Sequence, residues 1–120
     1  MKEEVKKWWE QAKDDLEKAR ILFDSKKYDG TVFYCQQTVE KAIKALLLKE
    51  KCKIIKIHDL VKLSREINLP ENLIEYCKEI TQSYIYSRYP DIERPRNLET
   101  IAFNFLKYTE EILEWIKKQL

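Results

Sequence analysis

The sequence predicts an all-helical protein, an antiparallel up-and-down bundle of four long helices plus one short helix. Apolar residues recur every three or four positions over long stretches, as on a helix that faces a core. One glycine and three prolines in 120 residues leave little of the turn material that an all-β fold needs. The expected connections are short, so neighbouring helices should run antiparallel. The length fits a single domain over residues 1–120.

Two apolar stripes predict the first two helices, over residues 2–25 and 28–49, with a short polar break between them. The first stripe consists of Val5, Trp8, Ala12, Leu16, Ala19 and Phe23. The second consists of Val32, Cys35, Val39, Ala42 and Leu46 and is widened by Phe33, Ile43 and Leu47. This broad apolar face predicts contacts on more than one side of the second helix. Trp8 and Trp9 point in different directions on a helix, so we expect one in the core and the other partly exposed, as a candidate interface anchor.

The middle of the chain predicts an extended connection followed by two helices. Residues 51–57 alternate like a strand, but no second strand signal is present to pair with them. A short helix should start at His58 and Asp59, either of which can cap it, and end near Asn68. Pro70 suits the first turn of the next helix, which should continue to Pro90. Its stripe is Leu73, Cys77, Ile80 and Tyr84.

A loop and a long final helix complete the predicted bundle. Residues 91–96 form the loop, and Asn97 is a favourable N-cap for the last helix. The stripe of this helix alternates steps of three and four, which suits lengthwise packing on another helix. Its members are Leu98, Ile101, Phe105, Tyr108, Ile112 and Trp115.

Composition removes several classes of function. Apolar residues make up 44% and charged residues 37%, which is the composition of a globular protein. The 23 Lys+Arg against 21 Asp+Glu give a net charge of +2, without the basic excess typical of a nucleic-acid surface. No apolar run approaches the roughly 20 residues that cross a bilayer, and the N-terminus is too charged for a signal peptide, so we expect no membrane contact and a cytoplasmic location. Three distant cysteines argue against disulfides and a zinc knuckle, and a single histidine argues against a di-iron site. We expect no metal and no cofactor.

Three ordered parts of the sequence resemble the HEPN family of small helical-bundle proteins. The first part is residues 8–16, WWEQAKDDL. The second is residues 28–29, YD, with residues 33–46, FYCQQTVEKAIKAL. The third is residues 58–60, HDL, with residues 84–91, YIYSRYPD. The resemblance implies a homodimer, a minimal nucleotidyltransferase as a possible partner in a toxin–antitoxin-like system, and, in many members, RNase activity.

The RNase pattern that the resemblance implies is incomplete in this chain. RNases of the family use an Arg followed after four to six residues by a His, which moves a proton of the ribose 2′-hydroxyl while the Arg binds the phosphate. Arg88 fits the arginine, but Glu93, Arg94 and Pro95 occupy the positions of the histidine. His58 lies far upstream. A metal-independent RNase would therefore need Arg88 with His58 or Glu93 as the proton-transfer group, and whether the protein is an enzyme stays open, with a non-catalytic role favoured.

The favoured hypothesis is a non-catalytic subunit that binds nucleotide or RNA phosphate. Arginine side chains grip phosphates and aromatic rings stack on bases, and both residue types gather around residues 84–96. The predicted binding residues are Tyr84, Arg88, Tyr89, Asp91, Arg94 and Arg96.

Structural roles compete with each of these assignments. Arg88 and Asp91 can form an ion pair at the end of a helix, and the tyrosines can belong to the core or to a dimer interface. Gln36 and Gln37 can be a buried hydrogen-bonding pair or an interface contact. A protein without any ligand, acting purely as a dimerisation or interaction module, is the third hypothesis.

Overall fold

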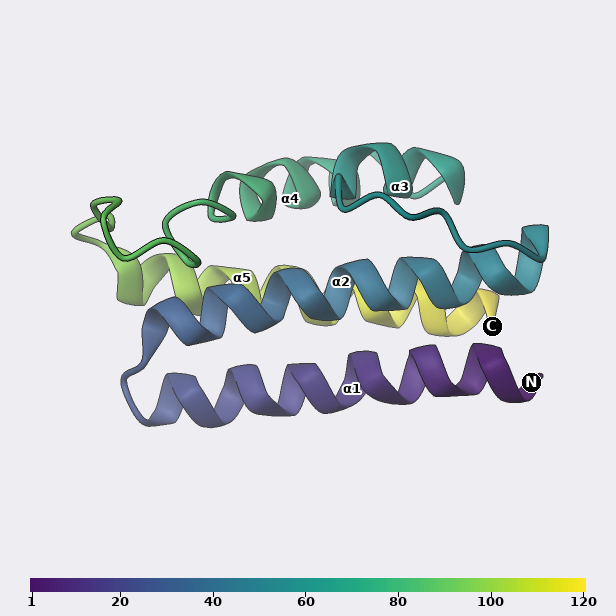
Figure 1. Ribbon diagram of the computed structural model, residues 1–120, viewed down its shortest axis with the longest axis horizontal. Coiled ribbons are helices and arrows are strands. Elements are labelled where there is room, and N and C mark those ends of the chain that lie inside the picture. Colours follow the sequence, from purple (N-terminus) through teal and green to yellow (C-terminus); the bar gives the residue numbers. More distant parts are fainter.

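Three long helices and two shorter ones make up the computed structural model, which describes all residues from 1 to 120 and contains no strand. The helices are α1 (Glu3–Asp24), α2 (Tyr28–Lys51), α3 (Leu60–Glu66), α4 (Glu71–Gln82) and α5 (Leu98–Gln119). Figure 1 shows α1, α2 and α5 lying lengthwise, with α3 and α4 end to end along the far side of α2 from α1. The molecule measures 41 × 24 × 24 Å. The predicted all-helical bundle is confirmed.

Helix α2 is the centre of the fold, because each of the other four helices packs against it. Most of its side chains from Val32 to Leu47 are buried, on several sides of the helix, which confirms the prediction drawn from its broad apolar face. Helix α1 covers one side through Val5, Trp9 and Leu16, among others. Of the two adjacent tryptophans, Trp9 is buried and Trp8 is half-buried, as expected.

The fourth helix is shorter than the sequence predicts. It was expected to reach Pro90, but α4 ends at Gln82 and a series of turns follows. The N–H groups of Ser83 and Tyr84 bond to carbonyls three residues back, and the Ser83 hydroxyl donates to the Ile80 carbonyl at 2.6 Å. These bonds tighten the last turn and take up carbonyl groups that a continuing helix would use. The bundle therefore has three long helices instead of four.

The predicted extended connection is confirmed, since residues 52–59 form neither helix nor strand. Asp59 is the N-cap of α3: its carboxylate accepts hydrogen bonds from the N–H groups of Val61 and Lys62, at 3.0 and 3.1 Å. His58 therefore lies outside the helix and does not cap it. Asn97 precedes α5 as expected, although its side chain makes no capping bond.

The core face of α5 is rotated slightly from the predicted stripe. Tyr108 and Trp115 are half-buried, whereas Thr109 and Ile116 beside them are fully buried. Small Ala102 and Thr109 take the central positions of this face, which lets the backbone of α5 approach its neighbours while the large rings lie at the edge. None of the five helices is long and apolar enough to cross a membrane.

Candidate functional site

Arg88 lies between two aromatic rings on the face of the molecule that α2 shares with the turns after α4. Its guanidinium carbon is 3.7 Å from the ring centroid of Tyr84 and 4.7 Å from that of Phe33. Nη1 donates to Gln36 Oε1 at 3.1 Å and to the Tyr84 carbonyl at 3.3 Å. Nε and Nη2 have no protein acceptor, yet neither is among the buried atoms that lack a partner, so solvent reaches both. The side chain is thus held in one orientation with donors to spare.

No ion pair joins Arg88 to Asp91, so the predicted helix-end ion pair is wrong. The early end of α4 places Arg88 in a turn whose side chain reaches back to α2 instead of forward to Asp91. Asp91 itself is exposed.

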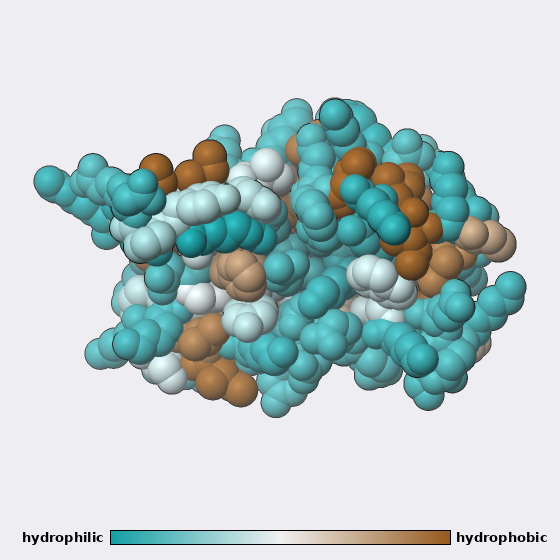
Figure 2. Space-filling model, in the orientation of Figure 1, coloured by the Kyte–Doolittle hydropathy of each residue, from teal (hydrophilic) through white to brown (hydrophobic).

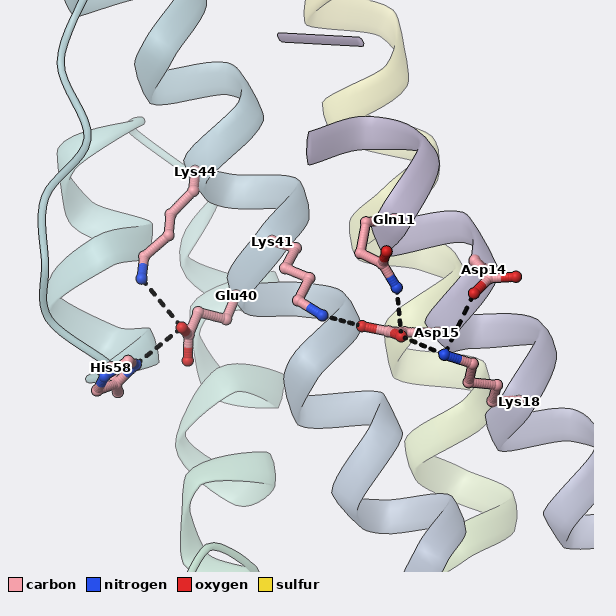
Figure 3. Close-up of polar contacts among 8 residues, drawn as sticks. All are labelled: Gln11, Asp14, Asp15, Lys18, Glu40, Lys41, Lys44 and His58. Carbon is pink, nitrogen blue, oxygen red and sulfur yellow. Dashed lines mark hydrogen bonds and ion pairs between the residues drawn. The ribbon is translucent and has the colours of Figure 1, made fainter. Parts of the chain in front are cut away.

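His58 is bound to a buried carboxylate of α2, the helix whose Gln36 also bonds to Arg88. Its Nδ1 lies 2.8 Å from Glu40 Oε2, and the same oxygen accepts from Lys44 Nζ at 3.0 Å (Figure 3). The side chains of Glu40 and Lys44 are 9% and 6% exposed, whereas that of His58 is 67% exposed. A carboxylate on Nδ1 favours the tautomer with the proton on that nitrogen. Nε2 is then the free acceptor of an exposed ring.

Gln36, Glu40 and Lys44 follow one another at intervals of four residues and therefore form one row along α2. All three are buried, an unusual position for side chains of this kind. Because Gln36 bonds to Arg88 and Glu40 to His58, Arg88 and His58 attach to α2 about one helical turn apart. The structure thus brings onto one face two residues that are 30 positions apart in the sequence.

Of the other predicted binding residues, Arg94 and Arg96 lie in the loop before α5, and neither shares a bonding partner with Arg88. Arg94 Nη2 is 3.5 Å from Asp29 Oδ2, and Nη1 donates to the carbonyls of Tyr89 and Ile92. Arg94 thus fastens the loop to the start of α2. Arg96 and Glu93 are exposed and form no hydrogen bond or ion pair within the chain.

The tyrosines of this region differ in their surroundings. Tyr84 and Tyr86 are half-buried, and Tyr89 is 51% exposed. Burial raises the pKa of the Tyr86 hydroxyl, which packs against the core. Tyr84 has one ring face covered by Arg88, so Tyr89 is the predicted stacking residue with the most open ring. No three His, Cys, Asp or Glu side chains gather in a group that can hold a metal ion.

A second buried carboxylate joins α1 to α2. Asp15 is 1% exposed and accepts from Lys41 Nζ at 2.6 Å and from Gln11 at 3.0 Å. In Figure 3, Lys41 points from α2 toward Asp15 on α1, whereas neighbouring Glu40 points toward His58. The two clusters thus lie on different sides of α2.

The sequence profile of the HEPN domain matches residues 5–119. The chain belongs to the HEPN family. Similarity to a named relative adds a second line of support: the "putative toxin MJ1304" of Methanocaldococcus jannaschii is 30% identical, over 88% of this chain and 81% of that protein.

Solved structures resemble this HEPN domain over nearly its whole length. TT1696 from Thermus thermophilus has a TM-score of 0.86 at 26% identity and covers 97% of this chain and 98% of its own. ST0689, described as an archaeal HEPN homologue, has a TM-score of 0.80 at 31% identity, with 99% and 98% covered. A HEPN protein from Thermotoga maritima, tm0613, shares the fold, with a TM-score of 0.74 at 22% identity over 92% and 94% of the two chains.

Sequence reasoning missed three residues that shape the site of this HEPN domain. The apolar pattern assigns Phe33 only to the core face of the second helix and gives no role to Glu40 or Lys44. In the structure the three residues contact Arg88, His58 and Trp8 in turn. The sequence itself partly indicated the buried polar row. Gln36, Glu40 and Lys44 recur at intervals of four on the helix that is otherwise the most apolar, so a row of polar side chains inside the core was foreseeable.

Proposed function

We propose that this HEPN domain is a non-catalytic subunit that binds the phosphate of RNA or of a nucleotide through Arg88. The observation that carries the proposal is the arrangement around the guanidinium: two rings and Gln36 fix its orientation, while Nε and Nη2 have no protein acceptor and are in contact with solvent. A guanidinium edge with two free donors matches two oxygens of a phosphate group. A side chain that is already ordered also loses less entropy on binding.

Partners form the less direct part of the proposal. The HEPN resemblance implies a homodimer and a minimal nucleotidyltransferase as partner, and the name of the Methanocaldococcus relative supports a toxin-like system. Light scattering on the purified protein measures whether it forms a homodimer. Co-expression with a nucleotidyltransferase encoded beside the gene, followed by size exclusion, tests whether the two proteins form a complex.

Arg88 substitutions test the binding proposal. Titration with a single-stranded RNA or with ATP should show binding by the wild type, and Arg88→Ala should weaken it about tenfold or more, because charge-assisted hydrogen bonds are lost. Arg88→Lys should weaken it too, since an ammonium cannot present a planar pair of donors. Arg20→Ala is the matched control: Arg20 is exposed on α1, 3.7 Å from Glu110, and carries the same charge. Equal affinity of Arg88→Ala and wild type, with a loss of thermal stability only, would instead favour the interaction-module hypothesis.

RNA cleavage is the second candidate function, and the geometry of His58 favours it. Glu40 orients the imidazole so that Nε2 is free, about one turn of α2 from the residue that binds Arg88. In such a reaction Nε2 removes the proton of a ribose 2′-hydroxyl, whose oxygen attacks the adjacent phosphorus. The bond to the 5′-oxygen breaks, which leaves a 2′,3′-cyclic phosphate, and the 5′-oxygen takes up a proton from water to become a hydroxyl. Arg88 stabilises the charge on the phosphate oxygens. Glu93 has no contact with Arg88 or His58.

Incubation of RNA with the protein in EDTA separates the two candidates. A nuclease should cleave RNA without metal and lose activity in both His58→Ala and Arg88→Ala, whereas Glu93→Gln should remain active. Intact RNA in the wild type supports the non-catalytic proposal. Activity that survives His58→Ala would exclude His58 as the proton-transfer group.

A further inference from the structure

A small hollow lies between α1 and α2, on the side of α2 from which Lys41 reaches Asp15. Lys7, Trp8 and Gln11 of α1 and Lys41 of α2 line it, and its volume is about 290 Å³. That volume is at the lower limit of small-molecule sites, so the hollow suits one flat group better than a large ligand. In Figure 2, pale side chains of intermediate hydropathy lie among hydrophilic ones on the viewed face, between α1 below and α3–α4 above.

The lining of the hollow is cationic and aromatic. It holds two ammonium groups, an amide and the half-buried Trp8 indole, and no carboxylate. Lys7 has no partner within the chain, and Lys41 is paired with Asp15. Lys44 lies over the Trp8 ring, 5.9 Å from its centroid, and one cation covers one side of a ring only. An aromatic ring beside positive charge is the combination that binds single-stranded nucleic acid.

The hollow is connected to the proposed phosphate site through the buried row on α2. Lys44 contacts Trp8, and it is bonded to Glu40, which in turn binds His58. Eight residues separate Lys44 from Gln36, the partner of Arg88, which corresponds to about 12 Å along the helix. A stacked strand advances about 3.4 Å per nucleotide, so this span equals roughly three to four nucleotides.

We infer that the Trp8 hollow binds a base of the same RNA strand whose phosphate occupies Arg88, with Lys7 and Lys41 near the strand's phosphates. The inference rests on the proposed function and adds a substrate class: single-stranded RNA of several nucleotides, lying along α2. A base pair would hide the base face that Trp8 needs, so double-stranded RNA is disfavoured. Mononucleotides and dinucleotides are too short to reach both positions.

Binding of short and long strands by matched variants tests this inference. The probes are a 2′-O-methyl oligoadenylate of about ten nucleotides, within known site sizes and resistant to 2′-hydroxyl attack, and the corresponding dinucleotide. Trp8→Ala should weaken binding of the long strand about fivefold or more and leave the dinucleotide unaffected, and Trp8→Phe should retain most of the affinity. Phe103→Ala is the matched control, because Phe103 is likewise an aromatic ring beside a lysine, Lys107, but lies on α5. It should bind like the wild type.

A second measurement needs no substitution. A strand containing 4-thiouridine, crosslinked to the wild-type protein and digested with trypsin, should label the peptide that contains Trp8. Labelling elsewhere only, or long-strand binding that is unchanged in Trp8→Ala, would overturn the inference. If Trp8→Ala leaves binding unchanged but Arg88→Ala weakens it, the proposed function of Arg88 stands without the Trp8 inference. If neither probe binds the wild type, the proposed function and the Trp8 inference both fail. A change in molecular mass for Trp8→Ala without a change in affinity would assign Trp8 to a protein interface and also overturn it.

Discussion

Glu40 should be one of the positions most sensitive to substitution in the protein, because it alone compensates the charge of Lys44. The Lys44 side chain is 6% exposed, and its ammonium bonds to Glu40 Oε2 at 3.0 Å. Glu40→Ala leaves a buried ammonium without a partner, and breaking a buried ion pair in this way costs about 3–5 kcal/mol. For a chain of this length that corresponds to a fall in melting temperature of about 12 °C or more.

Two further variants separate this effect from simple loss of contacts. His58→Ala removes the other partner of Glu40, but the ring is 67% exposed, so the free energy of unfolding should fall by less than about 1 kcal/mol. Glu40→Leu combined with Lys44→Met replaces the pair by apolar groups of similar size and should lie within about 1 kcal/mol of wild type. Urea unfolding monitored by circular dichroism measures all of them. A loss below about 1 kcal/mol in Glu40→Ala, or a double variant as unstable as the single one, would refute the reasoning.

Three other predictions concern stability. Asp59→Ala should lower the free energy of unfolding by about 1 kcal/mol, since its carboxylate caps two N–H groups of α3. Asn97→Ala should change it by less than about 0.5 kcal/mol, because Asn97 makes no capping bond, and thermal melts of the two variants test both values. Thr38→Val should raise the free energy of unfolding by about 1 kcal/mol, because the buried Thr38 hydroxyl has no partner; a loss of stability would show that the hydroxyl is bonded. Burial raises the pKa of the Cys35 and Cys77 thiols to about 12. The thiols of the unfolded chain therefore ionise first as the pH rises. The stability that the two buried thiols contribute is complete below about pH 9 and is lost as the pH rises toward 12. Between about pH 8 and pH 10.5, the free energy of unfolding should therefore fall less in Cys35→Ala than in wild type.

The sequence by itself determined the fold class and most of the helix positions. The apolar stripes of α1 and α2 repeat over about five and about four turns, and a long periodic signal leaves little choice about which side is buried. Local chemistry was sufficient for the start of α3, where Asp59 caps, and for the absence of helix in residues 52–59. The family resemblance could also be seen in ordered stretches of the chain.

The end of α4 and the rotation of α5 depended on information that the stripe alone does not contain. Tyr84 continues the apolar spacing of α4, so periodicity predicts helix as far as Pro90. The helix nevertheless ends at Gln82, where Ser83 bonds its hydroxyl back to the Ile80 carbonyl. On α5, Tyr108 and Thr109 compete for the core, and the smaller side chain occupies it because close approach of the helices favours small residues there.

Only the tertiary structure decided the composition of the candidate site. Arg88 and His58 are 30 residues apart, on segments whose relative placement depends on where α4 ends and how the connection after α2 crosses the bundle. An ion pair between Arg88 and nearby Asp91 was one alternative from the sequence, but the turn after α4 directs Arg88 to Gln36 and Phe33 on α2. The carboxylate that orients His58 comes from α2 as well. A contact between two side chains depends on the packing of their elements, and local sequence patterns specify each element but not the distance between them.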